Sequence, residues 1–417
     1  MKFEEYHFAK EIKESLKEMN FKRPTDIQYK AIPSILKGED VMAIAQTGTG
    51  KTAAFAIPIL HKLHYAIQKN REENRIRCLV MVPTRELALQ ITEVFRSLAK
   101  HTELVILSTF GGVSQEPQIE ELSFGIDVLI STPGRLFDLR SQGHLDISKV
   151  EILVLDEADH MLALGFLQDI HDVVRHLPRK HQTLFFSATI DERIKEVAYS
   201  LVHNPIRIQI SPKDPVAKNV DHAVAFIEMD DKRFFLERII RENESNKVLV
   251  FVRTKVRAER VQKAMARVGI ETLTLHGDKD QEERFEALEG FRNGICKVLI
   301  ATDLSARGID VAGVTVVINY DLPDVAENYV HRVGRTGRGT EKGDAISFCA
   351  SEERKILDEI ETFLDKEIKV LEVSKAAYTL TKILTNEAKN DWQKLIDDAA
   401  KEDALWRQKN PKKNKKK

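Results

Sequence analysis

Residues 45–52 read AQTGTGKT, a glycine-rich run that directly follows the apolar segment VMAIA. Glycines let backbone N–H groups turn inward around phosphate oxygens, and a following helix adds the positive end of its dipole. Lys51 can then reach the β- and γ-phosphates, while the hydroxyl of Thr52 can ligate Mg²⁺. The strict pattern has glycine where Ala45 stands, but Gly48 and Gly50 keep its essential part. Taken alone, the motif could also be a plain glycine-rich turn.

A second motif, EILVLDEAD, places Asp156 and Glu157 at the exposed end of an apolar strand. An acid at that place can hold Mg²⁺, usually through water, and its neighbour can orient or deprotonate an attacking water. Charged residues also end many strands, and for an isolated pair that interpretation would be preferred. Because this pair follows a phosphate-binding loop in the same α/β pattern, the two motifs together predict a nucleotide triphosphatase.

The segments that must position these residues alternate between short apolar runs and longer amphipathic stretches. Such runs are typical of strands buried on both faces, in a parallel sheet covered by helices. Three prolines in residues 204–216 interrupt the pattern and predict an interdomain linker. We therefore expect an α/β fold with two tandem units. The apolar runs lie at 41–45, 78–82, 127–131, 151–156 and 183–188, and then at 247–252, 272–277, 297–302, 314–320 and 345–350.

The composition fits a globular protein of two domains, since 417 residues exceed one ordinary core. Lys and Arg total 64 against 65 for Asp and Glu, so any affinity for nucleic acid must come from local patches. No apolar run approaches the roughly 20 residues needed to span a bilayer, and the charged start lacks a secretory segment. Three dispersed cysteines argue against a disulfide framework or a zinc site. We expect a cytoplasmic protein.

Residues 156–159 spell DEAD, and the blocks around them appear in the order and spacing of one family. Over roughly residues 1–370 the chain resembles the DEAD-box RNA helicases of superfamily 2, and its short core resembles bacterial members. Besides the two motifs above, the matching blocks are FKRPTDIQ (21–28), PTRELA (83–88), GG (111–112), TPGR (132–135), SAT (187–189), VFVRTK (250–255), QEER (281–284), ATDLSARGID (301–310) and HRVGRTGR (331–338).

The resemblance implies two RecA-like domains that close on ATP in their cleft and on single-stranded RNA across both. ATP and Mg²⁺ are the implied cofactors, with Thr52 and Asp156 holding the metal, partly through water. Gln28 is expected to read the adenine edge, and Phe3 and Phe21 to pack near the base. The remaining implied nucleotide contacts are Ala45, Gln46, Thr47, Gly48, Thr49, Gly50, Lys51, Thr52 and, at the ribose, Asp310.

The same resemblance implies catalytic roles for Lys51, Asp156 and Glu157, and identifies Arg335 and Arg338 as arginine fingers from the second domain. Phosphoryl transfer needs positioning and charge neutralisation, and a supplied arginine contributes about 10³–10⁵ in rate. Fingers on a separate domain make hydrolysis conditional on closure. The implied coupling between the ATP site and domain movement falls on Asp159, Ser187, Thr189 and His331.

The family's RNA contacts fall on residues whose backbone amides, hydroxyls and guanidinium groups suit phosphate and sugar. Such contacts position a strand without reading its sequence, and the 2′-OH separates RNA from DNA. In the first domain they are Pro83, Thr84, Arg85, Gly112, Thr132, Gly134 and Arg135. In the second they are Arg253, Thr254, Gly277, Arg284 and Thr302.

The expected division of the chain is a Q-motif region at 1–29, an ATP-binding domain at 30–208, a linker at 209–217, a second domain at 218–372, a helical extension at 373–406 and a basic tail at 407–417. After about residue 350, one helix is expected from Ser351 and another from Asp391. The tail has seven basic residues and no acid, which predicts disorder. It could tether RNA phosphates or serve only solubility.

Three functions remain open from the sequence. The first is an RNA-dependent ATPase that locally unwinds short RNA duplexes or remodels RNA–protein complexes. The second is an ATP-gated RNA clamp without significant unwinding, whose core motifs would be the same. The third is a DNA helicase of the same superfamily, against which the Gln28 motif, DEAD and PTRELA argue together. The core is expected to be monomeric, and the sequence identifies no protein partner.

Overall fold

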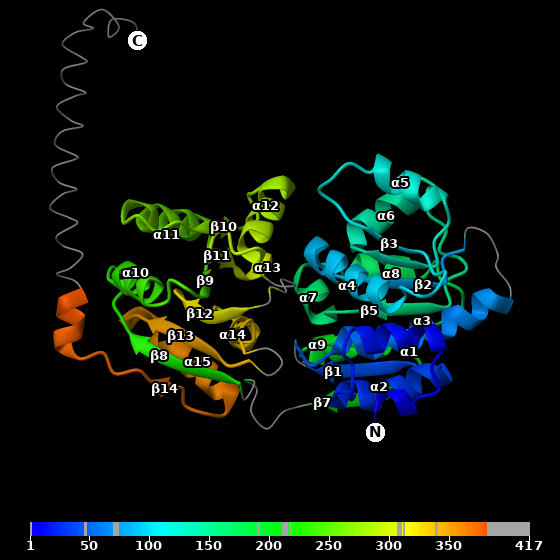
Figure 1. The fold of residues 1–417 in the computed structure, drawn as a ribbon, viewed down its shortest axis with the longest axis horizontal. Coiled ribbons are helices and arrows are strands. Elements are labelled where there is room, and N and C mark those ends of the chain that lie inside the picture. The colour runs from blue at the N-terminus through cyan, green and yellow to red at the C-terminus, as the bar shows by residue number, and fades with distance from the viewer. Residues whose placement is uncertain are drawn as a thin grey trace, which may run out of the picture.

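The computed structural model contains two α/β domains, each built around a parallel sheet (Figure 1). It describes residues 2–45, 48–69, 75–189, 192–210, 216, 219–306, 311, 313–337 and 341–381. Four residues that the resemblance placed in the site lie outside these ranges: Gln46, Thr47, Asp310 and Arg338. The helix expected from Asp391 and the basic tail at 407–417 also lie outside them.

The first sheet has the strand order β3-β4-β2-β5-β6-β1-β7, and all its pairings are parallel. Each of the five apolar runs of this half forms a strand. The edge strands β3 and β7 were not among those runs, because both are short and only partly apolar. The strands are β1 (Val41–Ala45), β2 (Cys78–Met81), β3 (Ile106–Thr109), β4 (Val128–Ser131), β5 (Ile152–Leu155), β6 (Gln182–Ser187) and β7 (Ile206–Ile210).

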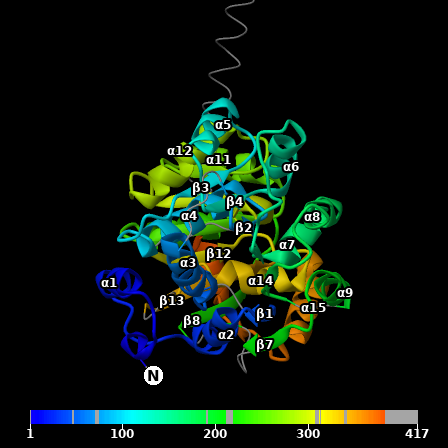
Figure 2. The same ribbon diagram turned by 90° about the vertical axis from the view of Figure 1, so that its right-hand side faces the viewer.

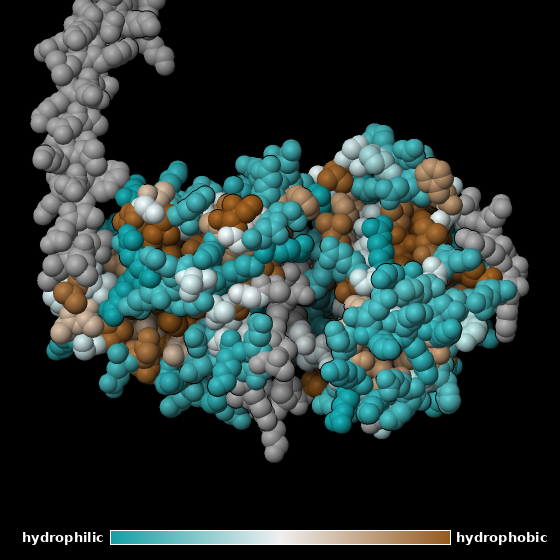
Figure 3. Space-filling view, viewed as in Figure 1, coloured by the Kyte–Doolittle hydropathy of each residue, from teal (hydrophilic) through white to brown (hydrophobic). Residues whose placement is uncertain are grey.

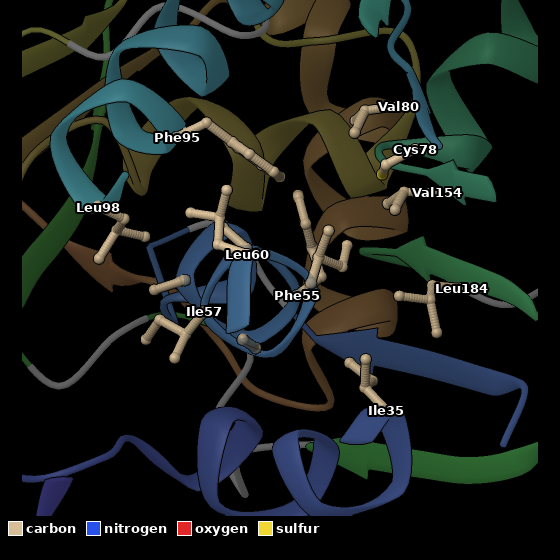
Figure 4. Close-up of a cluster of buried hydrophobic side chains, with 14 of the residues drawn as sticks. Ile35, Phe55, Ile57, Leu60, Cys78, Val80, Phe95, Leu98, Val154 and Leu184 are labelled. Carbon is tan, nitrogen blue, oxygen red and sulfur yellow. The ribbon is translucent and has the colours of Figure 1, made fainter. Parts of the chain in front are cut away.

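Helices cover both faces of this sheet, as buried parallel strands require. On β1, Val41 and Ala43 pack into one core cluster while Met42 and Ile44 pack into the other, which is the alternation of a strand. Figure 2 shows α1–α3 on one side of the strands and α7–α9 on the other. Figure 4 shows Phe55 of α3 among the apolar side chains of the cluster that contains Val41 and Ala43. The ring centroids of Phe55 and of Phe186 on β6 are 5.1 Å apart.

The helices of the first domain follow the predicted pattern. Pro58 lies inside the helix after the phosphate loop, and α3 continues past it to Lys69. The helix keeps its apolar face across Pro58, and burial of that face outweighs the lost hydrogen bond. The elements are η1 (Phe3–Glu5), α1 (Lys10–Glu18), α2 (Asp26–Lys37), α3 (Lys51–Lys69), α4 (Arg85–Leu98), α5 (Glu116–Ser123), α6 (Pro133–Ser141), α7 (Ala158–Ala163), α8 (Leu167–Val174) and α9 (Glu192–Leu201).

The second sheet, β10-β11-β9-β12-β13-β8-β14, repeats the order of the first when its strands are numbered along the chain. All its pairings are parallel. The strands are β8 (Val220–Phe226), β9 (Lys247–Val252), β10 (Leu273–Leu275), β11 (Val298–Thr302), β12 (Val314–Asn319), β13 (Gly343–Cys349) and β14 (Lys369–Val370). The helices are α10 (Lys232–Glu242), α11 (Lys255–Arg267), α12 (Gln281–Arg292), α13 (Asp303–Ala306), α14 (Ala326–Val333), η2 (Ser351–Glu353) and α15 (Arg354–Leu364).

Two segments, at the ends of the two domains, differ in detail from the sequence patterns. Residues 206–210, inside the proline-rich stretch, form strand β7 beside β1, because Pro205 and Pro212 flank this short strand instead of interrupting it. The helix expected from Ser351 begins as the 3-10 turn η2 and continues as α15. Residues 375–381 are also helical and pack against α10, where the Tyr378 ring lies 4.9 Å from that of Phe235.

The two domains lie side by side and contact each other between α4 and α12. Glu86 of α4 forms a 2.7 Å ion pair with Arg284 of α12, and Arg85 donates to the side chain of Gln281 at 3.1 Å. Hydrophilic residues cover most of the face in Figure 3, and its apolar residues form separate patches. Among the described residues, none of the helices has the length and apolar character that crossing a membrane requires.

Candidate nucleotide and RNA site

The glycine-rich loop joins β1 to α3 and presents Lys51 as the first residue of that helix. The Lys51 side chain is buried, and its Nζ atom has no hydrogen-bond partner. A buried cation without a partner costs free energy, so the loop is arranged for an anion that Lys51 would bind. The helix N-terminus adds backbone N–H groups at the same place.

Gln28 connects this loop to the helix before β1. Its Oε1 atom accepts from the Thr25 backbone N–H at 2.9 Å, closing the capping box of α2, and its Nε2 atom donates to the Gly50 carbonyl at 3.1 Å. Gly50 has φ +88°, and a Cβ atom there would lie 2.5 Å from Nε2 of Gln28. Glycine is therefore required at position 50, and the Gln28 amide lies beside the phosphate loop.

The two aromatic residues expected near the base lie together at the chain's beginning. The rings of Phe3 and Phe21 meet edge to face with a centroid distance of 5.8 Å, and Phe3 is buried. Both line a pocket of about 600 Å³ that also has a basic rim, a volume within the usual range for ligand pockets. The basic residues of this pocket are Lys2, Lys13, Lys17, Lys22 and Arg23.

The acidic pair follows β5 and is buried, with opposite effects on the two carboxyl groups. Burial raises the pKa of Asp156 to about 6, although the nearby Lys51 charge opposes the rise. Burial also acts to raise the pKa of Glu157, but the hydrogen bond and charge of His160, with the charges of Lys51 and Arg335, lower it to about 2. Glu157 is thus fully ionised at neutral pH, whereas Asp156 begins to take up a proton as the pH falls towards 6.

The backbone at Glu157 is itself unusual. It has φ +50° and ψ +47°, a left-handed conformation that non-glycine residues seldom adopt, immediately before α7. The Glu157 carbonyl accepts from the N–H groups of His160 and Met161, and Nδ1 of His160 lies 3.4 Å from a Glu157 carboxylate oxygen. The helix start thereby fixes the direction of the Glu157 side chain.

Three of the four residues expected to couple the site to domain movement are connected. Asp159 accepts from the backbone N–H of Thr189 at 3.3 Å and from its hydroxyl at 3.1 Å, while the Ser187 hydroxyl donates to the Thr189 carbonyl at 2.7 Å. The end of β6 is therefore attached to the helix that follows the acidic pair. His331 contributes its carbonyl oxygen, which accepts from Nε of Arg335 at 3.2 Å.

Arg335 lies in the turn after α14 of the second domain and is buried. Its charge reaches Glu157 of the first domain, since it contributes to the low pKa of that carboxyl. The structure therefore brings this arginine of the second domain within electrostatic range of Glu157 in the first.

Arg332, which lies three residues before Arg335 in the HRVGRTGR block, was not among the residues expected at the site. This fully buried side chain makes a bidentate pair with Asp303 at 2.5 and 2.7 Å, and donates to the carbonyl of Asp321 at 2.7 Å. It joins the ends of β11 and β12 to α14, which carries Arg335 on its following turn.

The residues expected to bind RNA in the first domain lie where parallel strands end and helices begin. After β2 and the buried Pro83, Thr84 caps α4 by accepting from the Leu87 N–H at 3.3 Å. Thr132 stands at the same kind of position before α6. A Cβ atom at Gly134 would meet nothing within 4 Å, so the backbone there is open. Helix starts of this kind suit phosphate groups.

Arg135 in the first turn of α6 is largely buried. Its NH2 group donates to the carbonyl of Val113 at 2.7 Å, while its NH1 atom has no hydrogen-bond partner. The guanidinium group is therefore held by one side and retains an unused donor on the other.

The second domain repeats this arrangement. Thr254 follows β9 and caps α11, accepting from the Arg257 N–H at 3.2 Å. Thr302 ends β11, with its hydroxyl 3.4 Å from that of Ser305. Gly277 follows β10 and has open space at its Cβ position. Counted along the chain, Thr84 and Thr254 thus lie just after the second strand of their domains. Thr132 follows the fourth strand of the first domain, and Thr302 ends the fourth strand of the second.

Three other residues of the expected RNA set take part in contacts between the domains. Arg85 donates to Gln281, and Arg284 pairs with Glu86. Gly112 has φ +79°, and a Cβ atom there would lie 2.8 Å from the Gln281 side chain. In this arrangement they hold the domains together at the edge where the other residues of the set lie.

Two family models match the chain: "DEAD/DEAH box helicase" over residues 25–197 and "Helicase conserved C-terminal domain" over residues 231–340. The "ATP-dependent RNA helicase RhlB" of Shewanella piezotolerans is 39% identical over 372 residues, which are 88% of this chain and 85% of that protein. The "DEAD-box ATP-dependent RNA helicase RhpA" of Helicobacter pylori is 38% identical over 371 residues, covering 89% and 74%.

Solved structures agree with these matches. S. cerevisiae Dbp5 bound to RNA and ADP BeF3 has a TM-score of 0.82 at 30% identity, covering 92% of this chain and 99% of that one. Mss116p bound to ssRNA and AMP-PNP has a TM-score of 0.80 at 27% identity, covering 90% and 80%. The expected tandem RecA-like fold is confirmed, and this chain belongs to the DEAD-box family of ATP-dependent RNA helicases.

Proposed function

We propose that this helicase hydrolyses ATP in the cleft between its domains while it holds single-stranded RNA across both, and thereby separates short RNA duplexes or remodels RNA–protein complexes. The observation that carries the proposal is the buried amine of Lys51, without a partner, beside an acidic pair that the Arg335 charge reaches from the other domain.

Each charged group has a role that suits its surroundings. Lys51 would neutralise phosphate charge, for which its unpartnered amine is available. Glu157, ionised and fixed by its left-handed backbone, would accept a proton from the attacking water. Arg335 would stabilise charge that develops on the transferred phosphate, as Arg338 would on the family's pattern. Because both arginines belong to the second domain, hydrolysis depends on domain closure.

The residues present also fit Mg²⁺, which would neutralise phosphate oxygens when bound with the nucleotide. Thr52 offers a hydroxyl, and Asp156 a buried carboxyl group whose ionised form a cation would favour. Among the described residues, no group of three His, Cys, Asp or Glu side chains could hold a metal ion by itself. The nucleotide's own oxygens would therefore complete the coordination.

The base and ribose contacts are proposals of the same kind. The Gln28 amide, which donates to the Gly50 carbonyl, supports adenine binding near the phosphate loop. Phe3 and Phe21, which pack against each other, would lie near the base on the family's pattern. RNA would run along the strand ends where Thr84, Thr132 and Thr254 begin helices.

The deciding experiment measures ATP hydrolysis with no nucleic acid, with single-stranded RNA and with single-stranded DNA, alongside release of a labelled strand from a short RNA duplex. We expect stimulation by RNA but not by DNA, together with strand release. Stimulation without release would make the protein a clamp, and equal stimulation by DNA would contradict the RNA assignment.

A Glu157→Gln variant separates binding from chemistry in the same assay. It keeps the size and hydrogen bonding of the side chain but loses the base, so nucleotide and RNA should still bind while turnover collapses. Loss of nucleotide binding would instead give Glu157 a structural role.

We also propose a cytoplasmic location. It is supported by the free thiols of the three cysteines, Cys78, Cys296 and Cys349, each of which is buried. Reduced thiols are the usual state of cysteine in that compartment.

A further inference from the structure

Two carboxylates of contrasting exposure contact the guanidinium group of Arg253. Its NH2 atom donates to Oε1 of Glu353 at 2.9 Å, and its Nε atom lies 3.0 Å from Oδ1 of Asp324 without hydrogen-bond geometry. The Glu353 side chain is 3% exposed, whereas that of Asp324 is 63% exposed. Arg253 is thus bound firmly on its inner side and loosely on its outer side.

Glu353 is fixed by donors on both of its oxygens. Oε2 accepts from Nζ of Lys232 at 2.5 Å and from the Ala350 N–H at 3.0 Å, while Oε1 also accepts from the Leu322 N–H at 3.3 Å. A buried carboxylate with this set of donors has a single favourable position. It fixes the inner edge of Arg253 in turn.

The backbone of Arg253 is attached to the same cluster. Its N–H group donates to Oδ2 of Asp321 at 3.1 Å, while Arg257 and Lys232 lie 3.2 and 3.8 Å from the other oxygen of that carboxylate. Such a buried cluster is poor evidence for added stability, since desolvation offsets most of the attraction. It does determine where Arg253 points.

The Asp324 contact differs in strength and in accessibility. Exposed ion pairs contribute little free energy and are screened by salt. A phosphate group takes the same guanidinium donors as a carboxylate and binds them at least as well. Asp324 can therefore be displaced by phosphate, and Glu353 cannot.

We propose that the two carboxylates act on RNA binding with opposite signs: Glu353 positions Arg253 for a phosphate of the strand, and Asp324 competes with that phosphate. The proposal rests on the RNA role of Arg253 given above. It makes Glu353 and Lys232 positioning residues and Asp324 a residue that weakens RNA binding in the intact protein.

The test measures the dissociation constant for a labelled single-stranded RNA, with a non-hydrolysable ATP analogue, at several salt concentrations. Asp324→Asn should tighten binding about two- to fivefold at low salt, the range of an exposed pair. Glu353→Gln should weaken it about tenfold and lower the slope of log K against log salt by roughly 0.7, the loss of one phosphate contact on a single strand.

Two controls separate this effect from the loss of any negative charge. Asp230→Asn makes the same change at an exposed carboxylate near Tyr320 and should leave the affinity unchanged. In an Arg253→Ala background, Asp324→Asn should give no gain, because the group for which it competes is absent. A gain that persists in that background overturns the proposal.

The outcomes also distinguish this proposal from the proposed RNA role of Arg253, on which it rests. If Arg253→Ala binds RNA as tightly as the unchanged protein, the RNA role of Arg253 fails. If Arg253→Ala weakens binding while Asp324→Asn does not tighten it, the competition alone is overturned. Asp324 is exposed, so its variant folds even if Glu353→Gln does not.

Discussion

The two domains place a buried lysine and an aspartate at equivalent points of the same topology. Lys51 begins the helix after the first strand of one sheet, and Lys232 begins the helix after the first strand of the other. Asp156 and Asp321 lie at the carboxyl ends of the fifth strands. Only the surroundings of these pairs differ.

In the first domain the lysine amine has no hydrogen-bond partner, whereas in the second it lies 2.5 Å from Glu353 and 3.8 Å from Asp321. The second domain thus supplies from its own chain the anion that the first domain would obtain from a nucleotide. Both domains thus place a lysine at the start of the helix that follows their first strand. The lysine without a hydrogen-bond partner marks the binding site, and the paired lysine belongs to a structural cluster.

The largest effect should come from the arginine that the second domain supplies. Arg335→Ala should lower RNA-stimulated ATP hydrolysis by about 10³–10⁵, because it removes charge stabilisation from the transferred phosphate. Steady-state phosphate release measures this, with Arg260→Ala at an exposed site of the same domain as control. The fragment 1–210 should bind nucleotide but hydrolyse it poorly; robust RNA-stimulated turnover by that fragment would disprove the two-domain mechanism.

Removing the unpartnered lysine should impair chemistry without harming the fold. Lys51→Ala should lower hydrolysis by about 10³, as expected for loss of one preorganised charged donor. Unfolding in urea should show a much smaller loss of stability than removal of Lys232, because no hydrogen bond is broken and only the electrostatic attraction to Asp156 and Glu157 is lost. Near-normal turnover with saturating RNA would remove the phosphate site from this loop.

The equivalent change in the second domain should have the reverse effect. Lys232→Ala removes the nearer of the two cations paired with the buried carboxylate of Glu353 and leaves only Arg253, which should lower the free energy of unfolding by about 3–5 kcal/mol. Urea unfolding measures the change, with the exposed Lys263→Ala as control. If Lys232→Ala and Lys51→Ala alter stability equally, the two lysines do not differ as described.

A smaller effect should appear at Asp156 in the nucleotide-free protein. Its folded pKa, about 6, is raised above the ordinary value of 3.8, so the ionised carboxyl costs stability above pH 6. Asp156→Asn should therefore stabilise the protein by about 3 kcal/mol at pH 8. The advantage should shrink as the pH falls through 6 and vanish below about 4. Unfolding curves across this range measure it, and a destabilised variant at pH 8 would contradict the assignment.

Sequence patterns were sufficient for most strands of the two sheets and for the local motifs. The ten apolar runs became strands because burial on both faces leaves a continuous apolar signature. Four strands gave no such signal, because they are short or because their buried residues alternate with exposed ones: β3, β7, β8 and β14. AQTGTGKT was placed correctly between strand and helix, because its glycines and lysine act through local backbone geometry.

The partners that complete the site could not be predicted. Glu353 lies 121 residues from Lys232, and Arg284 lies 198 residues from Glu86. Contacts over such separations depend on how the sheets and domains pack, and they leave no periodic trace in a single sequence. The left-handed backbone conformation of Glu157 could not be predicted from the sequence either, because glutamate does not favour a positive φ.

Gly112 has a consequence for the balance between open and closed forms of the protein. A methyl group at that position would push the Gln281 side chain away and cost its bond with Arg85. The backbone strain of a side chain at φ +79° would be present in both forms, but the clash with Gln281 arises only when the domains are in contact. The clash would therefore raise the free energy of the closed form relative to the open form. Each increase of about 1.4 kcal/mol would reduce the closed population tenfold. The absence of a Cβ atom at position 112 thus helps to determine what fraction of the enzyme has its domains together for catalysis.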